Sequence, residues 1–169
     1  NRQAVRLARE VAGNDVLVSG NLSTTWDYRA DDADSHEIAR RQFLEQLEVQ
    51  VDEGVDLIIG ELFFDLGEAL IALDTAKATG LPVMMTMAFF AQPLSREGKS
   101  PAECAKALAD AGADIVGINC GRGPDQMLPL IDEMRNAIDG YIAIQAPAYR
   151  TTDEVPFFGG LPGFPDAME

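Results

Sequence analysis

The chain has 169 residues, 47% of them hydrophobic and 24% charged, which is the composition of one ordinary globular domain with a core of its own. Its 28 acidic residues against 13 lysines and arginines give a net charge of −15, which argues against nucleic acid and anionic membrane surfaces as partners, because both are bound through basic side chains. No stretch approaches the ~18 consecutive apolar residues of a membrane span, and two cysteines are too few for a disulfide framework, so we expect a soluble, cytoplasmic protein.

The first predicted elements are a helix, a strand and a polar loop. Apolar residues at helical spacing predict a helix over residues 2–12. Because this pattern is already under way at Asn1, we expect the native start, and with it any targeting peptide, to be missing. Residues 15–20, with the run Val16-Leu17-Val18, predict a short buried strand, and residues 21–28 predict a polar loop.

The same order of helix and strand repeats along the rest of the chain. The predicted elements are a helix capped by Asp34 or Ser35 that ends at Gly54, a strand over 55–60, a helix from Asp65 to Gly80, a strand over 82–87, a polar loop over 88–99, a helix from Ser100 to Gly112, a strand that ends at Cys120, a helix over 125–138 and a strand over 141–145. Residues 146–169 are rich in Pro and Gly and have no period, which predicts a long loop after the last strand.

Five strands that alternate with helices predict an α/β fold with a parallel sheet. Two architectures fit this order, an open doubly wound sheet and part of an eight-stranded βα barrel. The chain has no Gly-x-Gly-x-x-Gly after its first strand and no Gly-Lys-Ser/Thr motif, so the dinucleotide-binding and P-loop classes lose their main support.

In such a sheet, function gathers at the carboxyl ends of the strands. This rule predicts the candidate site without a structure. Its residues are Gly20, Asn21, Glu61, Thr86, Asn119, Cys120 and Gln145.

Cys120 has three interpretations. It could be a small buried hydrophobe, a thiolate nucleophile or a metal ligand. The only histidine, His36, lies at a predicted helix start with nothing that links it to this strand end, so a basic partner for a nucleophile is missing. A zinc site needs about three or four protein ligands, and the chain has no Cys-x-x-Cys or His-x-x-x-His pair. Cys104 lies inside a predicted helix, where we expect it to serve packing.

Glu61 follows an apolar strand, where a carboxylate is costly unless it meets a cation or hydrogen-bond donors. The α-ammonium group of a substrate would meet this need, and so would a neighbouring Lys or Arg. Aromatic residues near the same strand ends could form a wall that attracts a cation, although packing in the core or in loops is the better explanation for most of them. They are Trp26, Tyr28, Phe63, Phe64, Phe89, Phe90, Phe157 and Phe158.

Several segments resemble a known family. Residues 60–69 (Gly-Glu-Leu-Phe-Phe-Asp-Leu-Gly-Glu-Ala), 80–87 (Gly-Leu-Pro-Val-Met-Met-Thr-Met) and 112–120 (Gly-Ala-Asp-Ile-Val-Gly-Ile-Asn-Cys) resemble the homocysteine S-methyltransferase family. Residues 145–151 and 161–165 look like its betaine–homocysteine methyltransferase branch.

The resemblance implies a (β/α)8 TIM barrel that binds zinc through three cysteines at its carboxyl end. Cys120 matches the cysteine that ends the sixth strand, and the other two form an adjacent pair ending the eighth strand, beyond this sequence. The five predicted strands would then be the third to the seventh, so residues 1–169 are expected to form a single incomplete barrel domain. Such a piece should bind zinc weakly or not at all, and should not catalyse alone.

The resemblance also implies a reaction and its partners. A homocysteine thiol would take a methyl group from a small onium donor to give methionine, with Cys120 as the catalytic metal ligand. Glu61 matches the family's glutamate that holds the amino group of homocysteine, and Thr86 and Asn119 are the other candidate substrate-binding residues. Leu62 stands where the betaine branch has tyrosine, which leaves betaine and sulfonium donors, such as dimethylsulfoniopropionate and S-methylmethionine, open.

Two other functions stay open from the residues alone. One is a metal-free βα-barrel lyase or aldolase that works through Glu61, although no lysine ends a predicted strand to form a Schiff base. The other is a non-catalytic barrel that binds an amino acid. The sequence also leaves a homo-oligomer open.

Overall fold

The computed structural model describes residues 1–90 and 92–147. The elements of this part are α1 (Arg2–Ala12), β1 (Ser19–Ser23), α2 (Ala33–Asp52), β2 (Leu57–Phe63), α3 (Leu66–Lys77), β3 (Val83–Met87), α4 (Pro101–Asp110), β4 (Ile115–Asn119), α5 (Pro124–Ala137) and β5 (Tyr141–Gln145). The predicted α/β fold, with five parallel strands alternating with helices, is confirmed.

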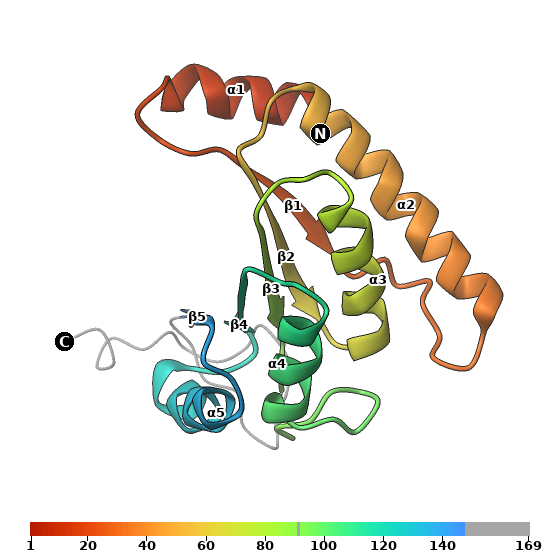
Figure 1. Ribbon diagram of the computed structural model, residues 1–169, viewed down its shortest axis with the longest axis vertical. Coiled ribbons are helices and arrows are strands. Elements are labelled where there is room, and N and C mark those ends of the chain that lie inside the picture. The colour runs from red at the N-terminus through yellow and green to blue at the C-terminus, as the bar shows by residue number, and fades with distance from the viewer. Residues whose placement is uncertain (91, 148–169) are drawn as a thin grey trace, which may run out of the picture.

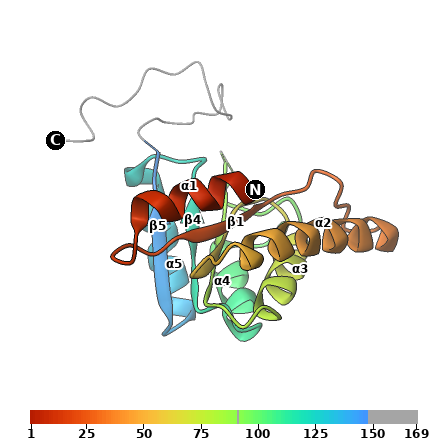
Figure 2. The ribbon, with the colours of Figure 1, turned by 90° about the horizontal axis from the view of Figure 1, so that it is seen from above.

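The five strands form one sheet in the order β1-β2-β3-β4-β5, and every neighbouring pair is parallel. Parallel neighbours need a crossover connection, and here a helix supplies each one. Figures 1 and 2 show α2 to α5 along one face of the curved sheet, with α1 beside the start of β1. This is the layering of part of a βα barrel, whose carboxyl strand ends form the carboxyl rim.

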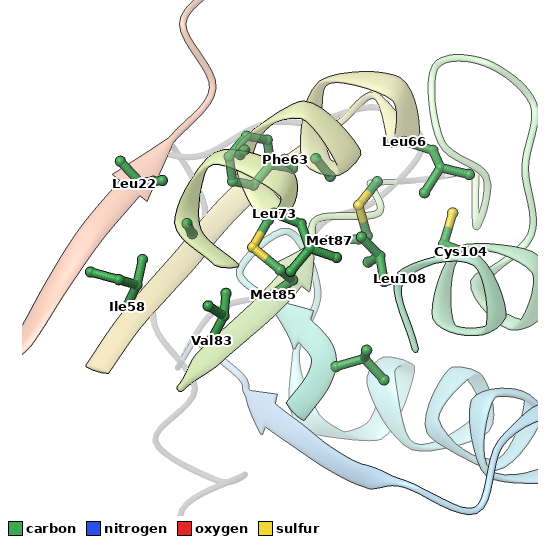
Figure 3. Close-up of a cluster of buried hydrophobic side chains, with 14 of the residues drawn as sticks. Leu22, Ile58, Phe63, Leu66, Leu73, Val83, Met85, Met87, Cys104 and Leu108 are labelled. Carbon is green, nitrogen blue, oxygen red and sulfur yellow. The ribbon is translucent and has the colours of Figure 1, made fainter. Parts of the chain in front are cut away.

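The core lies between the sheet and these helices (Figure 3). Side chains of β1 to β4 point into it, such as Ile58 and Met85, and the same core includes Leu73 of α3 and Leu108 of α4. Each fully buried side chain of this size contributes roughly 1.5–3 kcal/mol, so the core carries most of the stability. Cys104 lies in the same core and is fully buried, which confirms its role in packing.

The first strand was predicted in the wrong place. Val16 and Leu17 are 62% and 73% exposed, and β1 begins only at Ser19. Gly20 and Leu22 supply its buried positions, and a Cβ atom at Gly20 would lie 2.3 Å from Oε1 of Gln50. The true strand therefore carries little hydrophobic signal, because glycine occupies one of its two buried positions.

Two aspartates fasten the amino ends of the strands. Asp56, just before β2, donates its backbone N–H to the Val18 carbonyl (2.7 Å), and its carboxylate accepts the Val18 N–H (2.7 Å). Asp114, just before β4, makes the same pair of bonds with Val83, at 2.9 and 2.8 Å. Each carboxylate also pairs with a basic side chain of a preceding helix, Arg9 or Lys77.

Some predictions fall outside the described residues. Of the predicted loop over 146–169, only residues 146 and 147 are described, and Phe157 and Phe158 lie outside. Within the described ranges, no helix is both long and apolar enough to cross a bilayer.

Candidate functional site

Most of the predicted site residues lie at the carboxyl rim. Glu61, Thr86, Asn119 and Gln145 lie at or near the ends of their strands, and Cys120 directly follows β4. Gly20 and Asn21 do not, because β1 continues to Ser23 and places them in its middle. We call Glu61, Thr86, Asn119, Cys120 and Gln145 the site cluster.

A bulge in β2 presents Glu61. Gly60 pairs with Met85 and Phe63 pairs with Met87, so that Glu61 and Leu62 together lie opposite the single residue Thr86. This two-to-one count is a β-bulge, a feature that re-aims side chains near active sites. Leu62 takes the left-handed backbone with φ 61°, which is uncommon for a residue with a branched side chain.

The Asn119 side chain, at the end of β4, stabilises this bulge. Its Oδ1 accepts the Leu62 N–H at 2.9 Å and lies 2.9 Å from the Thr86 hydroxyl, which is also 3.0 Å from the Gly60 carbonyl. Asn119 is 2% exposed and Thr86 is fully buried. Both side chains are thus bonded to protein atoms beneath the rim.

Cys120 joins the cluster from the next strand. Its backbone has φ 53°, and its N–H donates to the Gln145 carbonyl at 3.1 Å. Burial raises the pKa of its thiol above the ordinary value, a hydrogen bond from the Asn119 side chain lowers that pKa, and the negative charge of Glu61 raises it. The Gln145 side-chain amide reaches the Glu61 carboxylate at 3.3 Å. Glu61 and Cys120 are therefore near neighbours.

The close packing of β4 and β5 brings Gln145 to this position. A Cβ atom at Gly117 would lie 2.2 Å from the Ala143 carbonyl oxygen, so only glycine allows this approach. The pairing continues to Asn119 and Gln145, which both belong to the site cluster.

The described residues do not complete a metal site by themselves. Within 1–90 and 92–147, no three His, Cys, Asp or Glu side chains are grouped to hold a metal ion. The cluster offers one thiol and one carboxylate, whereas tetrahedral zinc takes four ligands, usually three or four of them from protein. Cys104 cannot help, because it is fully buried in the core, which raises the pKa of its thiol to about 12.

Three of the predicted aromatic residues form a row along the rim, Trp26, Phe64 and Phe90. The ring centroids of Trp26 and Phe64 are 5.6 Å apart, and those of Phe64 and Phe90 are 5.4 Å apart. The Arg96 guanidinium lies 4.5 Å from the Phe64 ring centroid and 5.4 Å from that of Trp26. Sequence reasoning missed Arg96, since nothing in its polar loop marks it.

The other described aromatic residues of the predicted wall serve packing. Phe63 and Phe89 are fully buried in the core, and Tyr28 is buried against His36 with ring centroids 4.8 Å apart. The aromatic row borders a pocket of about 270 Å³ lined by Phe64, Ala88, Phe90, Gln92, Leu94 and Arg96.

The first turn of α3 anchors the loops of the rim. Glu97, in the loop after β3, accepts the N–H groups of Leu66 (2.7 Å) and Gly67 (3.1 Å) and the Tyr28 hydroxyl (3.1 Å). Glu68, fully buried on α3, accepts hydrogen bonds from the loop after β1 at 2.7 Å. Neither carboxylate was predicted to matter, because each partner is remote in sequence.

Comparisons with known proteins bear on what this arrangement does. The family model described as Homocysteine S-methyltransferase matches residues 1–156. Betaine--homocysteine S-methyltransferase 1 of Danio rerio is 38% identical over an alignment that covers all of this chain and 43% of that protein. S-methylmethionine--homocysteine S-methyltransferase of Pongo abelii is 35% identical, and 48% of it is covered. The chain spans less than half the length of these relatives.

Solved structures show the shared fold. The metallated form of the homocysteine methyltransferase MmuM from Escherichia coli matches with a TM-score of 0.65 at 16% identity, over 84% of this chain and 52% of that one. The carboxyl transferase domain of Rhizobium etli pyruvate carboxylase matches with a TM-score of 0.62 at 17% identity, over 87% of this chain and 25% of that one. At such low identity the likeness concerns the fold alone.

Proposed function

This chain belongs to the homocysteine S-methyltransferase family, and on that premise we propose that the complete protein transfers a methyl group from an onium donor to the thiol of homocysteine, giving methionine. The observation that carries the proposal is that Glu61 and Cys120 are both bonded to Gln145 at the carboxyl rim, Glu61 through its carboxylate and Cys120 through its backbone N–H. A carboxylate suits the amino end of the substrate, and a thiolate suits a metal that would hold its sulfur end.

Glu61 is proposed to bind the α-ammonium group of homocysteine. The bulge raises its carboxylate at the rim, where the Gln145 amide donates to one oxygen and leaves the other for a cation. A charge-assisted hydrogen bond of this kind contributes about 1.5–3 kcal/mol. That is enough to fix the amino end of a small substrate.

Cys120 is proposed as one ligand of a zinc ion. Its position at the rim and its thiol chemistry fit that role, and the remaining ligands would have to come from other parts of the protein. Bound zinc would deprotonate the substrate thiol and stabilise it as a thiolate near neutral pH. Cys120 and Glu61 together would orient homocysteine with its sulfur toward the donor.

The aromatic row bears on the class of the methyl donor. Electron-rich ring faces attract a quaternary ammonium or sulfonium group, and the aromatic row offers such faces. The Arg96 guanidinium already lies against two of these rings and pairs with the Asp65 carboxylate at 3.4 Å, so a donor would need ring faces that Arg96 does not cover. Betaine and sulfonium compounds share the cationic group that such faces attract.

Methyl-transfer assays with several donors, together with one variant at each of the two cysteines, test the proposal. The complete protein should form methionine from homocysteine with at least one of glycine betaine, dimethylsulfoniopropionate and S-methylmethionine, measured by mass spectrometry. Cys120→Ser should lower both zinc content and rate at least about 100-fold, because a hydroxyl is a poor zinc ligand. Cys104→Ser is the matched control and should keep the zinc.

Two results would contradict the proposal. Equal zinc content in Cys120→Ser and wild type would remove Cys120 from the metal site. Absence of methyl transfer from every donor, in a zinc-loaded protein, would favour a lyase or aldolase, or a barrel that only binds an amino acid.

A further inference from the structure

Backbone strain is concentrated at the carboxyl rim. Among the described residues, the non-glycine positions with positive φ are Trp26, in the loop after β1, Leu62, next to the last residue of β2, and Cys120, directly after β4. Such conformations are unfavourable for residues with a Cβ atom and persist only where the surroundings hold them. Two of the three lie in or beside the pair proposed to act on homocysteine.

Asn119 lies between two of the strained positions. Its Oδ1 must face the Leu62 N–H, because that N–H is a donor and needs an acceptor. Asn119 is also the last residue of β4, so Cys120 follows it directly in the chain. Asn119 thus links the residue that follows Glu61 to the backbone of Cys120.

The linkage closes into a ring. The Cys120 N–H donates to the Gln145 carbonyl (3.1 Å), and the Gln145 side chain donates to Glu61 (3.3 Å). Thr86, 2.9 Å from the Asn119 Oδ1, limits the rotation of the amide from the side of β3. Thr86 is fully buried and Asn119 is 2% exposed, so both lie almost wholly beneath the rim.

We infer that Asn119 is a positioning residue, which sets the Glu61 carboxylate and the Cys120 thiol at a fixed spacing through the β2 bulge, with Thr86 fixing the Asn119 amide. The inference rests on the proposed function for the roles of Glu61 and Cys120. It differs from the sequence-based prediction, in which Thr86 and Asn119 contact the substrate. Thr86 and Asn119 would thus affect homocysteine binding only through Glu61 and Cys120, which they align.

Two variants of the complete protein test this inference. Asn119→Ala removes the acceptor of the Leu62 N–H, and Thr86→Val removes the hydroxyl while keeping the side-chain volume. We expect hydrogen exchange at the Leu62 amide to accelerate at least about tenfold in Asn119→Ala, with the Ile58 amide unchanged because it donates to the Pro82 carbonyl. The KM for homocysteine should rise about tenfold in Asn119→Ala and about fivefold in Thr86→Val.

Conservative and matched variants separate positioning from stability. Thr86→Ser keeps the hydroxyl and should restore the wild-type KM. Thr75→Val is the control for a lost buried hydroxyl, because Thr75 bonds only to helix carbonyls of α3 and is remote from the rim. It should lower the unfolding midpoint without changing KM. If Asn119→Ala does not fold, Thr86→Val and Thr86→Ser make the same comparison.

Several outcomes would overturn the inference. An unchanged Leu62 exchange rate in a folded Asn119→Ala variant would show that Asn119 does not hold the bulge. An unchanged KM beside faster Leu62 exchange would show that the bulge does not matter to homocysteine, and an equal KM rise in Thr75→Val would show a general loss of stability. A wild-type protein that forms no methionine would instead remove the proposed function, while Leu62 exchange still decides whether Asn119 holds the bulge.

Discussion

Glu61 combines two properties that are rarely found in one carboxylate. It lies near the end of an apolar strand, yet among the described residues its carboxylate is bonded only to the neutral amide of Gln145, at 3.3 Å. A carboxylate in such a place is stabilised by a cation, and a substrate ammonium group would provide one. Its role can therefore be isolated by removing the charge and keeping the shape.

Glu61→Gln should raise the KM for homocysteine by about 10–100-fold, because a charge-assisted hydrogen bond of about 1.5–3 kcal/mol is lost. Zinc content and the unfolding midpoint should stay near wild type. Steady-state kinetics with varied homocysteine, together with metal analysis, measure both. Glu45→Gln is the matched control, since Glu45 is exposed on α2, away from the rim. A wild-type KM in Glu61→Gln would place the amino group elsewhere.

At the scale of the elements, the amino ends of the strands repeat one device. The sequences Gly54-Val55-Asp56 and Gly112-Ala113-Asp114 each precede a strand, and each aspartate makes the paired bonds to its neighbouring strand described above. Backbone hydrogen bonds, and then the basic partner, lower the pKa of both carboxyl groups below the ordinary 3.8. The two aspartates thus connect β1 to β2 and β3 to β4.

These lowered pKa values make stability depend on pH in a stated direction. A carboxyl group whose folded pKa is depressed stabilises the fold fully above its unfolded pKa of about 3.9, and this contribution disappears as pH falls through the lower folded pKa. Asp114→Asn should therefore flatten the loss of stability in that acidic window. At neutral pH it should cost less than about 1 kcal/mol, because solvent screens this half-exposed group. Urea denaturation across acidic pH measures the effect, and an acid slope equal to wild type would contradict it.

Apolar strands could be predicted from the sequence, whereas a strand with few apolar residues could not. β2 to β5 were located because runs such as Leu57-Ile58-Ile59 are branched and buried, whereas β1, Ser-Gly-Asn-Leu-Ser, buries a single large side chain. The end-of-strand rule found Glu61 and Cys120. It could not find the bulge, because the Leu62–Asn119 bond joins residues 57 positions apart.

The roles of Thr86 and Arg96 were beyond sequence reasoning for the same reason. Thr86 has the right place at a strand end, and only the burial of its hydroxyl beside Asn119 separates a supporting residue from one that touches substrate. Arg96 reaches Phe64 and Trp26 from a loop with no periodic pattern. Contacts between distant loops need coordinates.

At the scale of the whole molecule, the sheet is open and its first edge carries apolar surface. Val11 is 90% exposed, and with Leu7, Val16 and Leu17 it borders a hollow of about 640 Å³ beside β1. Unpaired strand edges and apolar patches favour association with other chains. The chain spans 43% and 48% of the two relatives named above, and in a closed barrel such an edge is paired.

The 169-residue chain on its own is therefore expected to bind a hydrophobic dye and to elute as oligomers, because this surface has no cover among the described residues. Fluorescence titration and gel filtration measure both properties. The double variant Val11→Asp, Leu17→Asp should reduce both, whereas Leu128→Asp, at an exposed position of α5, should change them little. A dye-free monomer of the unmodified chain would contradict the expectation.

The aspartates and the strained rim occupy opposite ends of the same strands. Between Asp56 and Glu61 the extended backbone spans about 16 Å, and substitutions farther apart than about 10 Å usually act independently. Substitutions at the amino ends of the strands could therefore raise stability to acid or heat, while substitutions at the carboxyl rim change donor preference. The stability gained at one end would add to the effects at the other end and would not reduce them.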